Sequence, residues 1–462
     1  MLKKISIISM VWIGFILVAP LAQSQTSSNV AAIQNSIKRY LKQKGFSGTI
    51  LVAEKGTPIY HQSFGLAQRK PSDKLQNDYH YGVASVTKLF TSIRILQLIE
   101  DKKIALSKSI TTYLPQWKSQ ISPKVSIHHL LLHISGLPNI KDEVYLKPWT
   151  PTQVVQRSLN NRPKTKIGKF NYNNMDYILL GLLIEQVTGN RWETEITQHI
   201  LKPFRLQNTG FLKYKNYSAK FAYPYSYQGK AKANKDPLFH IENFFSAGNM
   251  YSTAEDLLRL DQALYGDRLL KPASKKLLSK SYPRYGYAGY GVWNYAYPFI
   301  AQKPQIMERR GGIQGANVVL VRLIEANKTI IILSNDDRFN PDSFGDKTNL
   351  REMLIKALFA PSPLVGTWNV DLRPSPKAFP YIKELEISAV KGRKIEGIFY
   401  GQRITNGVLN RSWPRPYIAF HTSDLSNEYY HVAYLQDGQL RGVTYGIGRD
   451  FVAPWTAKKK NK

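Results

Sequence analysis

The order of hydrophobic and polar residues predicts two buried helices and a hairpin in the first half of the chain. Residues 86–99 and 175–187 are apolar on nearly every side, which is typical of helices enclosed by protein. Residues 31–44 carry apolar side chains at helical spacing on one side only, as an amphipathic helix does. Two apolar runs, 50–53 and 59–64, enclose a Lys-Gly turn and predict a β-hairpin.

The second half of the chain first continues to alternate predicted helices and strands, and then contains predicted strands alone. Residues 254–266 predict an amphipathic helix, because a Ser-Thr pair precedes them and acidic residues occupy the first turn. Residues 317–323 and 328–335 predict adjacent strands, and residues 348–359 predict a helix. After a proline-rich break at 360–368, only short β-rich runs separated by Gly, Asn and Asp follow.

This change of pattern predicts two folded domains in a chain of 462 residues. The first, residues 31–360, combines helices with strands. The second, residues 365–457, is expected to be a small β-sandwich or β-barrel. Residues 458–462 form a basic tail, which we expect to be a frayed terminus rather than a binding arm.

The N-terminus has the pattern of an export signal. Two lysines precede an apolar run at 5–18, and the small residues Ala22 and Ser24 then stand where a signal-peptidase cut requires them. The apolar run is shorter than the roughly 20 residues that a membrane-spanning helix needs. We therefore expect residues 1–24 to be a cleaved signal peptide and the mature protein to be periplasmic or secreted.

The distribution of charge and the absence of cysteine exclude or disfavour several classes of function. The net charge is +32, but the basic residues are spread along the whole chain rather than gathered in one patch or arm, which argues against nucleic-acid binding. We expect instead electrostatic contact with anionic surfaces of the cell envelope. The chain has no cysteine, which excludes disulfides, thiol catalysis and cysteine-ligated zinc.

Ser85 and Lys88 stand one turn apart at the start of the first buried helix. A serine hydroxyl becomes an effective nucleophile when a nearby base takes its proton, and a poorly solvated lysine can lose enough basicity to be that base. The alternative is a helix-capping serine beside a surface lysine. A second Ser-x-x-Lys pair, Ser388 and Lys391, lies in a strand-like stretch, where the two side chains would point to opposite faces. We interpret this second pair as structural.

Two further groups could complete a site with Ser85. Tyr172 and Asn174 come just before the second buried helix. A tyrosine near a lysine can act as a base or proton shuttle, and an asparagine amide can bind a substrate carbonyl or steady the lysine. Arg309 is the first and Gly312 the last residue of an Arg-Arg-Gly-Gly sequence at the start of a predicted strand. Glycines let a substrate lie close to a strand edge, where a backbone N–H can face an oxyanion.

Taken together and in this order, the motifs resemble the serine β-lactamase and penicillin-binding superfamily, in particular its class C, D,D-peptidase and related-esterase branch. The similarity covers roughly residues 33–359 and includes "YGVASVTKLF", "FNYNNMDYILLGLLIEQVTG" and "RRGGIQGANVVL". It implies an α/β (α+β) fold, in which an antiparallel sheet is flanked by helices and a helical subdomain carries the tyrosine motif. The C-terminal β-rich domain would be an addition to this fold.

The resemblance also implies a role for each motif residue. Ser85 would be the acylated nucleophile, and Lys88 and Tyr172 would share general-base and general-acid work. Asn174 would bind the amide or carbonyl of the substrate. The backbone N–H groups of Ser85 and Gly312 would form the oxyanion hole.

Two positions depart from the usual pattern of the family. Arg309 stands where His or Lys is usual. Arginine keeps the positive charge and can hold a substrate carboxylate with two bonds, but it does not give up a proton. We therefore expect Arg309 to bind substrate. Asn173 stands where Ser or Ala is more usual, and we expect little effect.

These observations predict an exported serine hydrolase that forms an acyl-enzyme at Ser85 and acts on a β-lactam, a D-amino-acid peptide or a carboxylic ester. The extra β-domain favours a peptidase or esterase over a dedicated β-lactamase. The alternative is a non-hydrolytic protein, either an envelope or peptidoglycan binder or a β-lactam sensor that acylates and stalls. The partner is expected to be a small molecule or cell-wall peptide, and no oligomeric state is predicted.

We expect neither a metal nor a cofactor. Three histidines, His128, His129 and His133, invite a metal-site interpretation. No carboxylate stands at a matching spacing, and the chain lacks the His-Glu-x-x-His pattern of zinc hydrolases. The turn that follows His133 suits a structural role for this segment.

Overall fold

The computed structural model describes residues 30–460, apart from 163–164, 228–233, 236–238, 314, 361, 374, 376, 392, 411–416 and 449. The chain divides into two compact units, with the boundary between Val365 and Gly366. The predicted signal peptide, residues 1–24, lies outside the described residues. None of the helices in the described ranges has the length and apolar character needed to cross a membrane.

The first unit combines helices with a central sheet. Its α-helices are α1 (Val30–Lys44), α2 (Thr87–Glu100), α3 (Ile110–Tyr113), α4 (Ile127–Leu131), α5 (Pro151–Leu159), α6 (Asn174–Thr188), α7 (Trp192–Ile196), α8 (Phe245–Gly248), α9 (Ala254–Ala263), α10 (Pro272–Leu278) and α11 (Leu350–Leu358). Its longer strands are β1 (Gly48–Glu54), β2 (Thr57–Phe64), β10 (Trp293–Ala296), β11 (Gln305–Ile313), β12 (Ala316–Leu323) and β13 (Lys328–Ser334). These bounds confirm the helices and strands that the hydrophobic pattern predicts for this part of the chain, to within a few residues at most ends.

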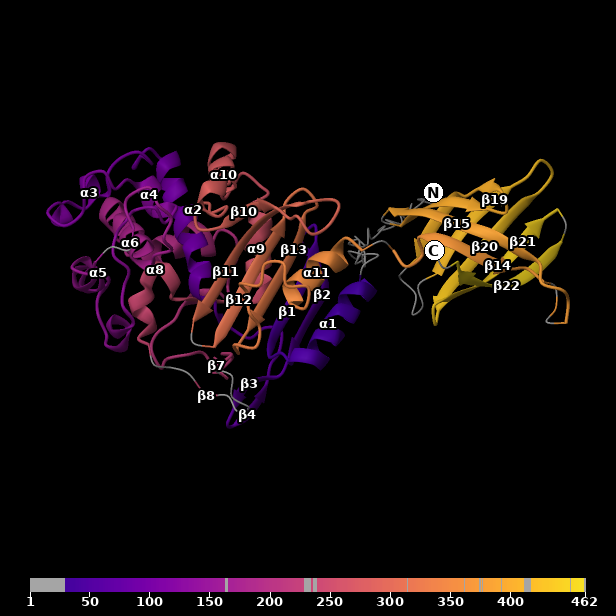
Figure 1. Cartoon of the computed structure of the whole chain (residues 1–462), viewed down its shortest axis with the longest axis horizontal. Helices are drawn as coiled ribbons and strands as arrows, with labels where there is room; N and C mark the ends of the chain where they lie inside the picture. The colour runs from indigo at the N-terminus through magenta and orange to yellow at the C-terminus, as the bar shows by residue number, and fades with distance from the viewer. Residues whose placement is uncertain are drawn as a thin grey trace, which may run out of the picture. The chain divides into compact units, whose positions relative to one another are not determined.

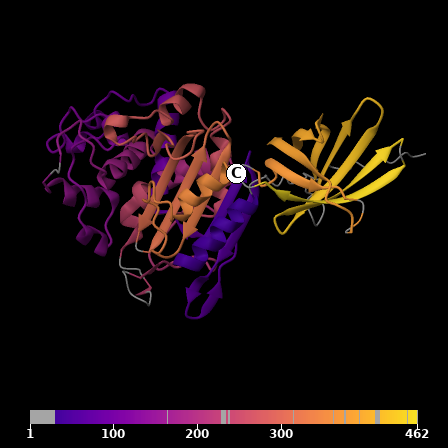
Figure 2. The same ribbon diagram turned by 45° about the vertical axis from the view of Figure 1, so that its right-hand side comes forward.

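The longer strands form one antiparallel sheet in the order β10-β11-β12-β13-β1-β2 (Figure 1). Because successive side chains of a strand point to opposite faces, the sheet has an apolar layer on each side. α1 and α11 lie side by side over one face (Figure 2), where Ile33 and Leu354 pack with Val319 and Ile332. On the other face, α2 and α6 belong to a larger core that also includes Val318 and Leu333.

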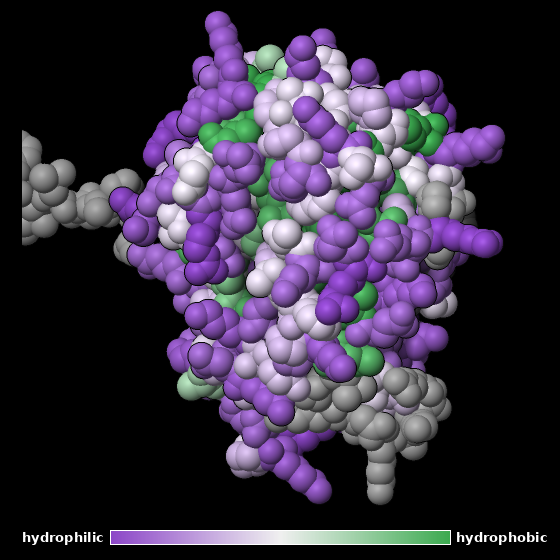
Figure 3. Space-filling view, turned by 90° about the vertical axis from the view of Figure 1, so that its left-hand side faces the viewer, coloured by the Kyte–Doolittle hydropathy of each residue, from purple (hydrophilic) through white to green (hydrophobic). Residues whose placement is uncertain are grey.

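α2 and α6 are enclosed as their apolar sequences predict. Nearly every residue of α2 from Thr87 to Leu98 is buried, and so is every residue of α6 from Met175 to Ile184. Gly189 ends α6 in the left-handed conformation, with φ of 73°, which a glycine adopts without strain. By contrast, the face of this unit that carries α3 and α5 is largely hydrophilic, with hydrophobic residues showing only in small separate areas (Figure 3).

A buried ionic network ties α11 to the strand that carries Arg309. Arg351 of α11 and Glu308 of β11 are both fully buried, and the Arg351 Nη2 and Glu308 Oε2 atoms lie 2.5 Å apart. Arg310 contacts the other oxygen of Glu308, and Tyr297 and Arg351 both contact Glu352. Buried charges require such pairing, so this network fixes how α11 packs against β11.

The second unit is a closed β-barrel. Its strands are β14 (Gly366–Asp371), β15 (Ile382–Lys391), β16 (Lys394–Phe399), β17 (Gln402–Arg403), β18 (Thr405–Asn410), β19 (Tyr417–Ser423), β20 (Glu428–Gln436), β21 (Gln439–Ile447) and β22 (Phe451–Lys459). They pair in the order β15-β14-β22-β21-β20-β19-β18-β16-β17, and β15 also pairs with β16, which closes the sheet. Of the two architectures expected for this region, the structure has the barrel. Strand β22 continues to Lys459, within the predicted basic tail.

Replacing Arg351 by methionine should destabilise the first unit. The substitution leaves Glu352 buried without its cation and Glu308 paired with Arg310 alone, and removing one partner of a buried pair costs about 3–5 kcal/mol. Calorimetric unfolding should show a lower transition temperature for the first unit and an unchanged transition for the barrel. Lys356→Met, on the same helix at a partly exposed position, is the matched control. Equal transition temperatures for the two variants would contradict the role given to the network.

Candidate active site

The nucleophile candidate Ser85 lies in a short 3₁₀ turn, η1 (Ala84–Val86), directly before α2. Ala84 has φ of 45°, in the left-handed region that costs a residue with a side chain about 1 kcal/mol or more. The N–H groups at the start of a helical segment lack partners within it and point outward. The turn therefore presents both the hydroxyl and the backbone N–H of Ser85 at the entrance to a buried helix.

Ser85 Oγ contacts both predicted proton-transfer residues. It lies 2.8 Å from the hydroxyl oxygen of Tyr172 and 3.1 Å from Lys88 Nζ. These distances are within hydrogen-bond range. The structure thus brings together three residues that are separated by up to 87 positions along the chain.

Lys88 is fully buried, and main-chain and side-chain oxygens surround its amino group. Lys88 Nζ donates to Asn174 Oδ1 and to the carbonyl oxygen of Ala247, each at 2.8 Å. Both of these oxygens can only accept, so two protons of Lys88 are committed to them. The remaining contact, to Ser85 Oγ, donates when Lys88 is an ammonium and accepts when it is an amine.

Tyr172 lies between two cations. Arg309 Nη2 donates to the Tyr172 hydroxyl oxygen at 2.6 Å, and Lys88 Nζ lies 5.0 Å from the centre of the Tyr172 ring. Burial alone would raise the pKa of Tyr172, but the positive charges of Arg309 and Lys88 outweigh it and lower this pKa from 10.0 to about 8. Tyr172 is therefore readily ionised and can accept the Ser85 proton.

The same environment lowers the basicity of Lys88. Burial is the main cause, and the nearby Arg309 charge adds to it, so the pKa of Lys88 falls from 10.5 to about 8. Tyr172 and Lys88 can therefore exchange a proton with each other near neutral pH at low cost. Groups with pKa values close to the working pH are suited to general acid–base catalysis.

Arg309 is held inside the site rather than open to solvent. It is only 2% exposed, and its Nε atom donates to the Ser85 carbonyl oxygen at 2.7 Å. Its guanidinium also lies 5.0 Å from the ring centre of Trp293, the first residue of β10. These contacts point to a second role for Arg309, the stabilisation of ionised Tyr172, beside the substrate-binding role expected from the sequence.

A second group of residues behind Tyr172 has no clear motif in the sequence. The buried Asn173 caps α6 by accepting from the Met175 N–H, and its amide nitrogen donates to the carbonyl oxygens of Leu137 and Pro138. The expectation that Asn173 has little effect overlooked this anchoring position. The signal available in the sequence was its place immediately before the helix, where Asn is a favoured cap.

His133 belongs to the same supporting group. Its ring centre is 4.4 Å from that of Tyr172, its Nδ1 lies 3.3 Å from Asp176 Oδ2, and Ser135 Oγ donates to the other Asp176 oxygen. Burial lowers the pKa of His133 and raises that of Asp176 well beyond their usual ranges, which favours a neutral pair. We infer that this pair supports the position of the Tyr172 ring.

Gly311 permits strand β11 to approach the nucleophile turn. A Cβ atom at Gly311 would lie 2.4 Å from the carbonyl oxygen of Val83 and 3.1 Å from the Ser85 nitrogen. β10 pairs with β11 only as far as Glu308, so residues 309–313 have a strand partner on one side alone within the described part of the sheet. Gly312, the second predicted oxyanion-hole residue, lies on this open edge.

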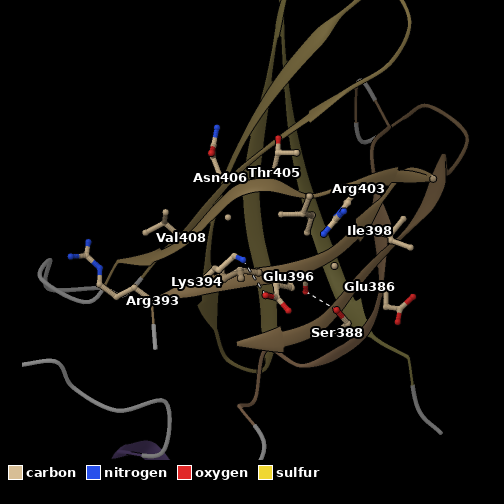
Figure 4. A pocket seen from close by; sticks show the side chains of 15 residues that line it. Glu386, Ser388, Arg393, Lys394, Glu396, Ile398, Arg403, Thr405, Asn406 and Val408 are labelled. Atoms are coloured by element: carbon tan, nitrogen blue, oxygen red, sulfur yellow. Dashed lines mark hydrogen bonds and ion pairs between the residues drawn. The ribbon is translucent and has the colours of Figure 1, made fainter. Parts of the chain in front are cut away.

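The second Ser-x-x-Lys pair is not part of this site. Ser388 lies in β15 at a bulge, and its hydroxyl donates to the carbonyl oxygen of Glu396 at 3.0 Å. Figure 4 shows Ser388 on the wall of an open depression over β15, β16 and β18, among side chains such as Arg403 and Glu386. The structural interpretation of this serine as a strand residue is confirmed.

Comparison with known proteins agrees with this geometry. The family model described as Beta-lactamase matches residues 33–354 of the chain. The chain belongs to the beta-lactamase family. This confirms the resemblance that the motifs indicate, and the protein is a serine hydrolase of the β-lactamase-related type. The match spans the nucleophile turn, Tyr172 and the Arg309 strand.

The proteins similar to this chain include a penicillin-binding protein and a teichoic acid D-alanine hydrolase. Penicillin-binding protein 4* of Bacillus subtilis (strain 168) is 28% identical over 336 residues, which cover 68% of this chain and 71% of the relative. The teichoic acid D-alanine hydrolase of Staphylococcus aureus (strain MRSA252) is 28% identical over 287 residues, covering 60% of this chain and 68% of the relative. A structure of an octameric penicillin-binding protein homologue from Pyrococcus abyssi matches 93% of this chain and 100% of its own with a TM-score of 0.61 and 19% identity, so it shares the fold.

Removing the charge of Arg309 should move the pH profile of the enzyme to higher pH. Arg309 lowers the pKa of both Tyr172 and Lys88. If Tyr172 acts ionised and Lys88 acts protonated, kcat/KM is bell-shaped around pH 8, and Arg309→Gln shifts both limbs upward by about one unit or more. The measurement is ester hydrolysis from pH 6 to 10. Arg309→Lys keeps the charge and should shift the profile less; an unchanged profile in Arg309→Gln would refute this assignment.

Gly311→Ala should lower activity without unfolding the protein. The added methyl group forces η1 and β11 apart by a few tenths of an ångström or more, and misplacement of reacting groups by about 1 Å can cost on the order of 10²-fold in rate. The matched control is Gly266→Ala, where the nearest atom to the new Cβ would be 3.9 Å away. If both variants retain full kcat/KM, the close approach of β11 is not needed for catalysis.

Proposed function

We propose that the protein is an exported hydrolase that transfers an acyl group from its substrate to Ser85 Oγ and then to water. The observation that carries the proposal is the pair of contacts of Ser85 Oγ with Tyr172 and Lys88, at 2.8 and 3.1 Å. A nucleophile in hydrogen-bond contact with a base that is itself oriented by a third group is the arrangement that covalent catalysis requires.

In the acylation step, ionised Tyr172 takes the Ser85 proton while Oγ attacks the substrate carbonyl carbon. The carbonyl oxygen becomes an oxyanion, which the backbone N–H groups of Ser85 and Gly312 stabilise. The proton then passes from Tyr172, with Lys88 as partner, to the leaving oxygen or nitrogen. The bond to the leaving group breaks, and an ester of Ser85 remains.

In the deacylation step, a water molecule replaces the leaving group. Tyr172 accepts a proton from this water as its oxygen attacks the ester carbon, and a second oxyanion forms in the same place. When it collapses, Ser85 Oγ leaves and regains a proton from Tyr172. The released acid and the free serine complete the cycle, with no group consumed other than water.

The position of Arg309 favours substrates that do not depend on a free carboxylate. Its Nε and Nη2 atoms already donate to Ser85 and Tyr172, and its side chain is buried. We therefore place carboxylic esters and D-amino-acid esters or amides ahead of β-lactams, whose ring carboxylate calls for an available cation. The name of the D-alanine hydrolase relative from Staphylococcus aureus supports the same order.

We also propose that the protein acts outside the cytoplasm. The signal-like residues 1–24 support export, and so do relatives named for binding penicillin and for acting on teichoic acid D-alanine. The net charge of +32 favours attraction to anionic envelope polymers. Such attraction would raise the local concentration of the enzyme near substrates attached to those polymers.

Covalent labelling tests the acyl-enzyme directly. Full-length protein is treated with a fluorophosphonate and, separately, with a fluorescent penicillin, and the intact mass is measured. We expect an adduct in the native protein and in Ser388→Ala, the matched control in the second Ser-x-x-Lys pair, and none in Ser85→Ala. Turnover is then measured with p-nitrophenyl esters, D-alanyl esters and amides, D-Ala-D-Ala peptides and a chromogenic cephalosporin.

Two results would contradict the proposal in different ways. If neither probe labels the protein, Ser85 is not a nucleophile and the hydrolase mechanism fails. A stable adduct without turnover of any substrate would instead support the non-hydrolytic sensor. Turnover of the cephalosporin well above that of the esters would reverse the order of substrates that the position of Arg309 favours.

A further inference from the structure

The interior of the C-terminal barrel is filled at one level and hollow at another. At the filled level, inward residues of four neighbouring strands lie in register: Ile418, Ala433, Gly442 and Trp455. A Cβ atom at Gly442 would be 2.4 Å from the Trp455 ring, so the indole occupies the space that a side chain would need. This level is close-packed as a protein core should be.

The neighbouring levels hold more polar residues, and Phe420 lies in register with His431. His431 lies in register with Thr444, which lies in register with Ala453, and Thr422 lies in register with Tyr429 in the next row. Together with Phe399 and residues at the barrel mouth, they line a cavity of about 550 Å³. This volume falls within the range of small-molecule sites, which barrels of eight strands can provide.

The polar wall of this cavity has one hydroxyl proton without an acceptor in the described residues. His431 is 3% exposed; its Nε2 and Nδ1 atoms lie 2.8 Å from the hydroxyl oxygens of Thr422 and Thr444. Trp455 Nε1 also donates to Thr444 at 3.0 Å. Burial lowers the pKa of His431 to about 3, so its ring is neutral and has one donor and one acceptor nitrogen.

The proton count gives the same result for either tautomer of His431. If Nδ1 carries the hydrogen, it donates to Thr444, whose own proton is then left over, while Thr422 donates to Nε2. If Nε2 carries the hydrogen, Thr444 donates to Nδ1 and the Thr422 proton is left over. A buried donor without a partner is unfavourable, and both threonines line the cavity, so an acceptor inside the cavity would satisfy it.

The other residues that line the cavity indicate the polarity and charge of a molecule that could bind there. Phe399 and Leu372 are apolar, and the rim carries Tyr381 and Tyr400, whose hydroxyls contact each other and whose rings lie within 5 Å of Lys383 Nζ. Among the described lining residues the one charged side chain is Asp424, an exposed carboxylate, and none of them is a cation. A carboxylate buried there would lack a counter-ion, which is costly, whereas a carbonyl oxygen would accept the spare proton without charge.

We propose that the barrel binds one small, uncharged, mostly apolar molecule that carries a carbonyl oxygen, with this oxygen directed at the Thr422–His431–Thr444 cluster. The aromatic rim surrounds the opposite end of the molecule. This site is independent of the catalytic site, since it uses only residues of the second unit.

The test uses Prodan, a neutral aromatic ketone whose emission shifts to the blue in apolar surroundings, and the full-length protein. We expect saturable binding of one Prodan per chain with a blue shift. Ala453→Trp, which fills the cavity, should abolish it. Thr422→Val and Thr444→Val each remove one hydroxyl and should weaken it about tenfold or less, as the loss of one hydrogen bond does.

The controls separate this site from the rest of the protein. Thr456→Val alters an exposed threonine of β22 and should leave the dissociation constant unchanged. Prior phosphonylation of Ser85 with a fluorophosphonate, with loss of fluoride, should also leave it unchanged. The proposal is overturned if no saturable binding occurs, if Ala453→Trp binds as well as native protein, if neither valine variant binds more weakly, or if phosphonylation of Ser85 displaces Prodan.

Discussion

The amino group of Lys88 imposes the strictest requirement on the catalytic unit. An ammonium or amine that is fully buried must find oxygen partners inside the protein, because an unpaired charge there is prohibitively unfavourable. Those partners come from separate elements: Ser85 from η1, Asn174 from α6 and the carbonyl oxygen of Ala247 from α8. The packing of the apolar helices α2 and α6 provides these partners, so the folding of the core also brings the candidate catalytic residues together.

Arg309 completes this arrangement by adding a charge that no pH change removes in practice. It lies against Tyr172 and Ser85, and its strand is fixed through the neighbouring Glu308 and the buried Arg351. The replacement of a titratable His or Lys by arginine therefore makes the electrostatic setting of the tyrosine constant. On the proposed mechanism, substrate selection would depend more on shape and hydrogen bonds than on pairing with a substrate carboxylate.

Much of the fold could be predicted because its signals are local. Continuous apolar runs predicted α2 and α6. The three sequence motifs that contain Ser85, Tyr172 and Arg309 predicted residues that the structure brings together. The carbonyl of Ala247 could not be found in this way, since a main-chain oxygen is present at every residue. The neutral pair of His133 and Asp176 was also missed, because its two members become neighbours only when α6 packs beside the turn after α4.

In the barrel, too, the alternation of apolar and polar residues predicted some features and not others. Alternating residues predicted short strands in the C-terminal region, but both a sandwich and a barrel have that pattern. The choice depends on the pairing of β15 with β16 as well as with β14, a property of register and strand twist rather than of any one residue. The cavity near His431 follows from small residues, such as Ala453, at particular levels of this closed sheet.

Closure of that sheet has a consequence for how the barrel meets other protein chains. An open sheet ends in strands whose free N–H and C=O groups can pair with another chain and begin aggregation. In the described part of the barrel, each long strand has a neighbour on both sides, and the strand at the end of the order, β17, has only two residues. The described part of the accessory unit thus offers almost no template for edge-to-edge association with another chain.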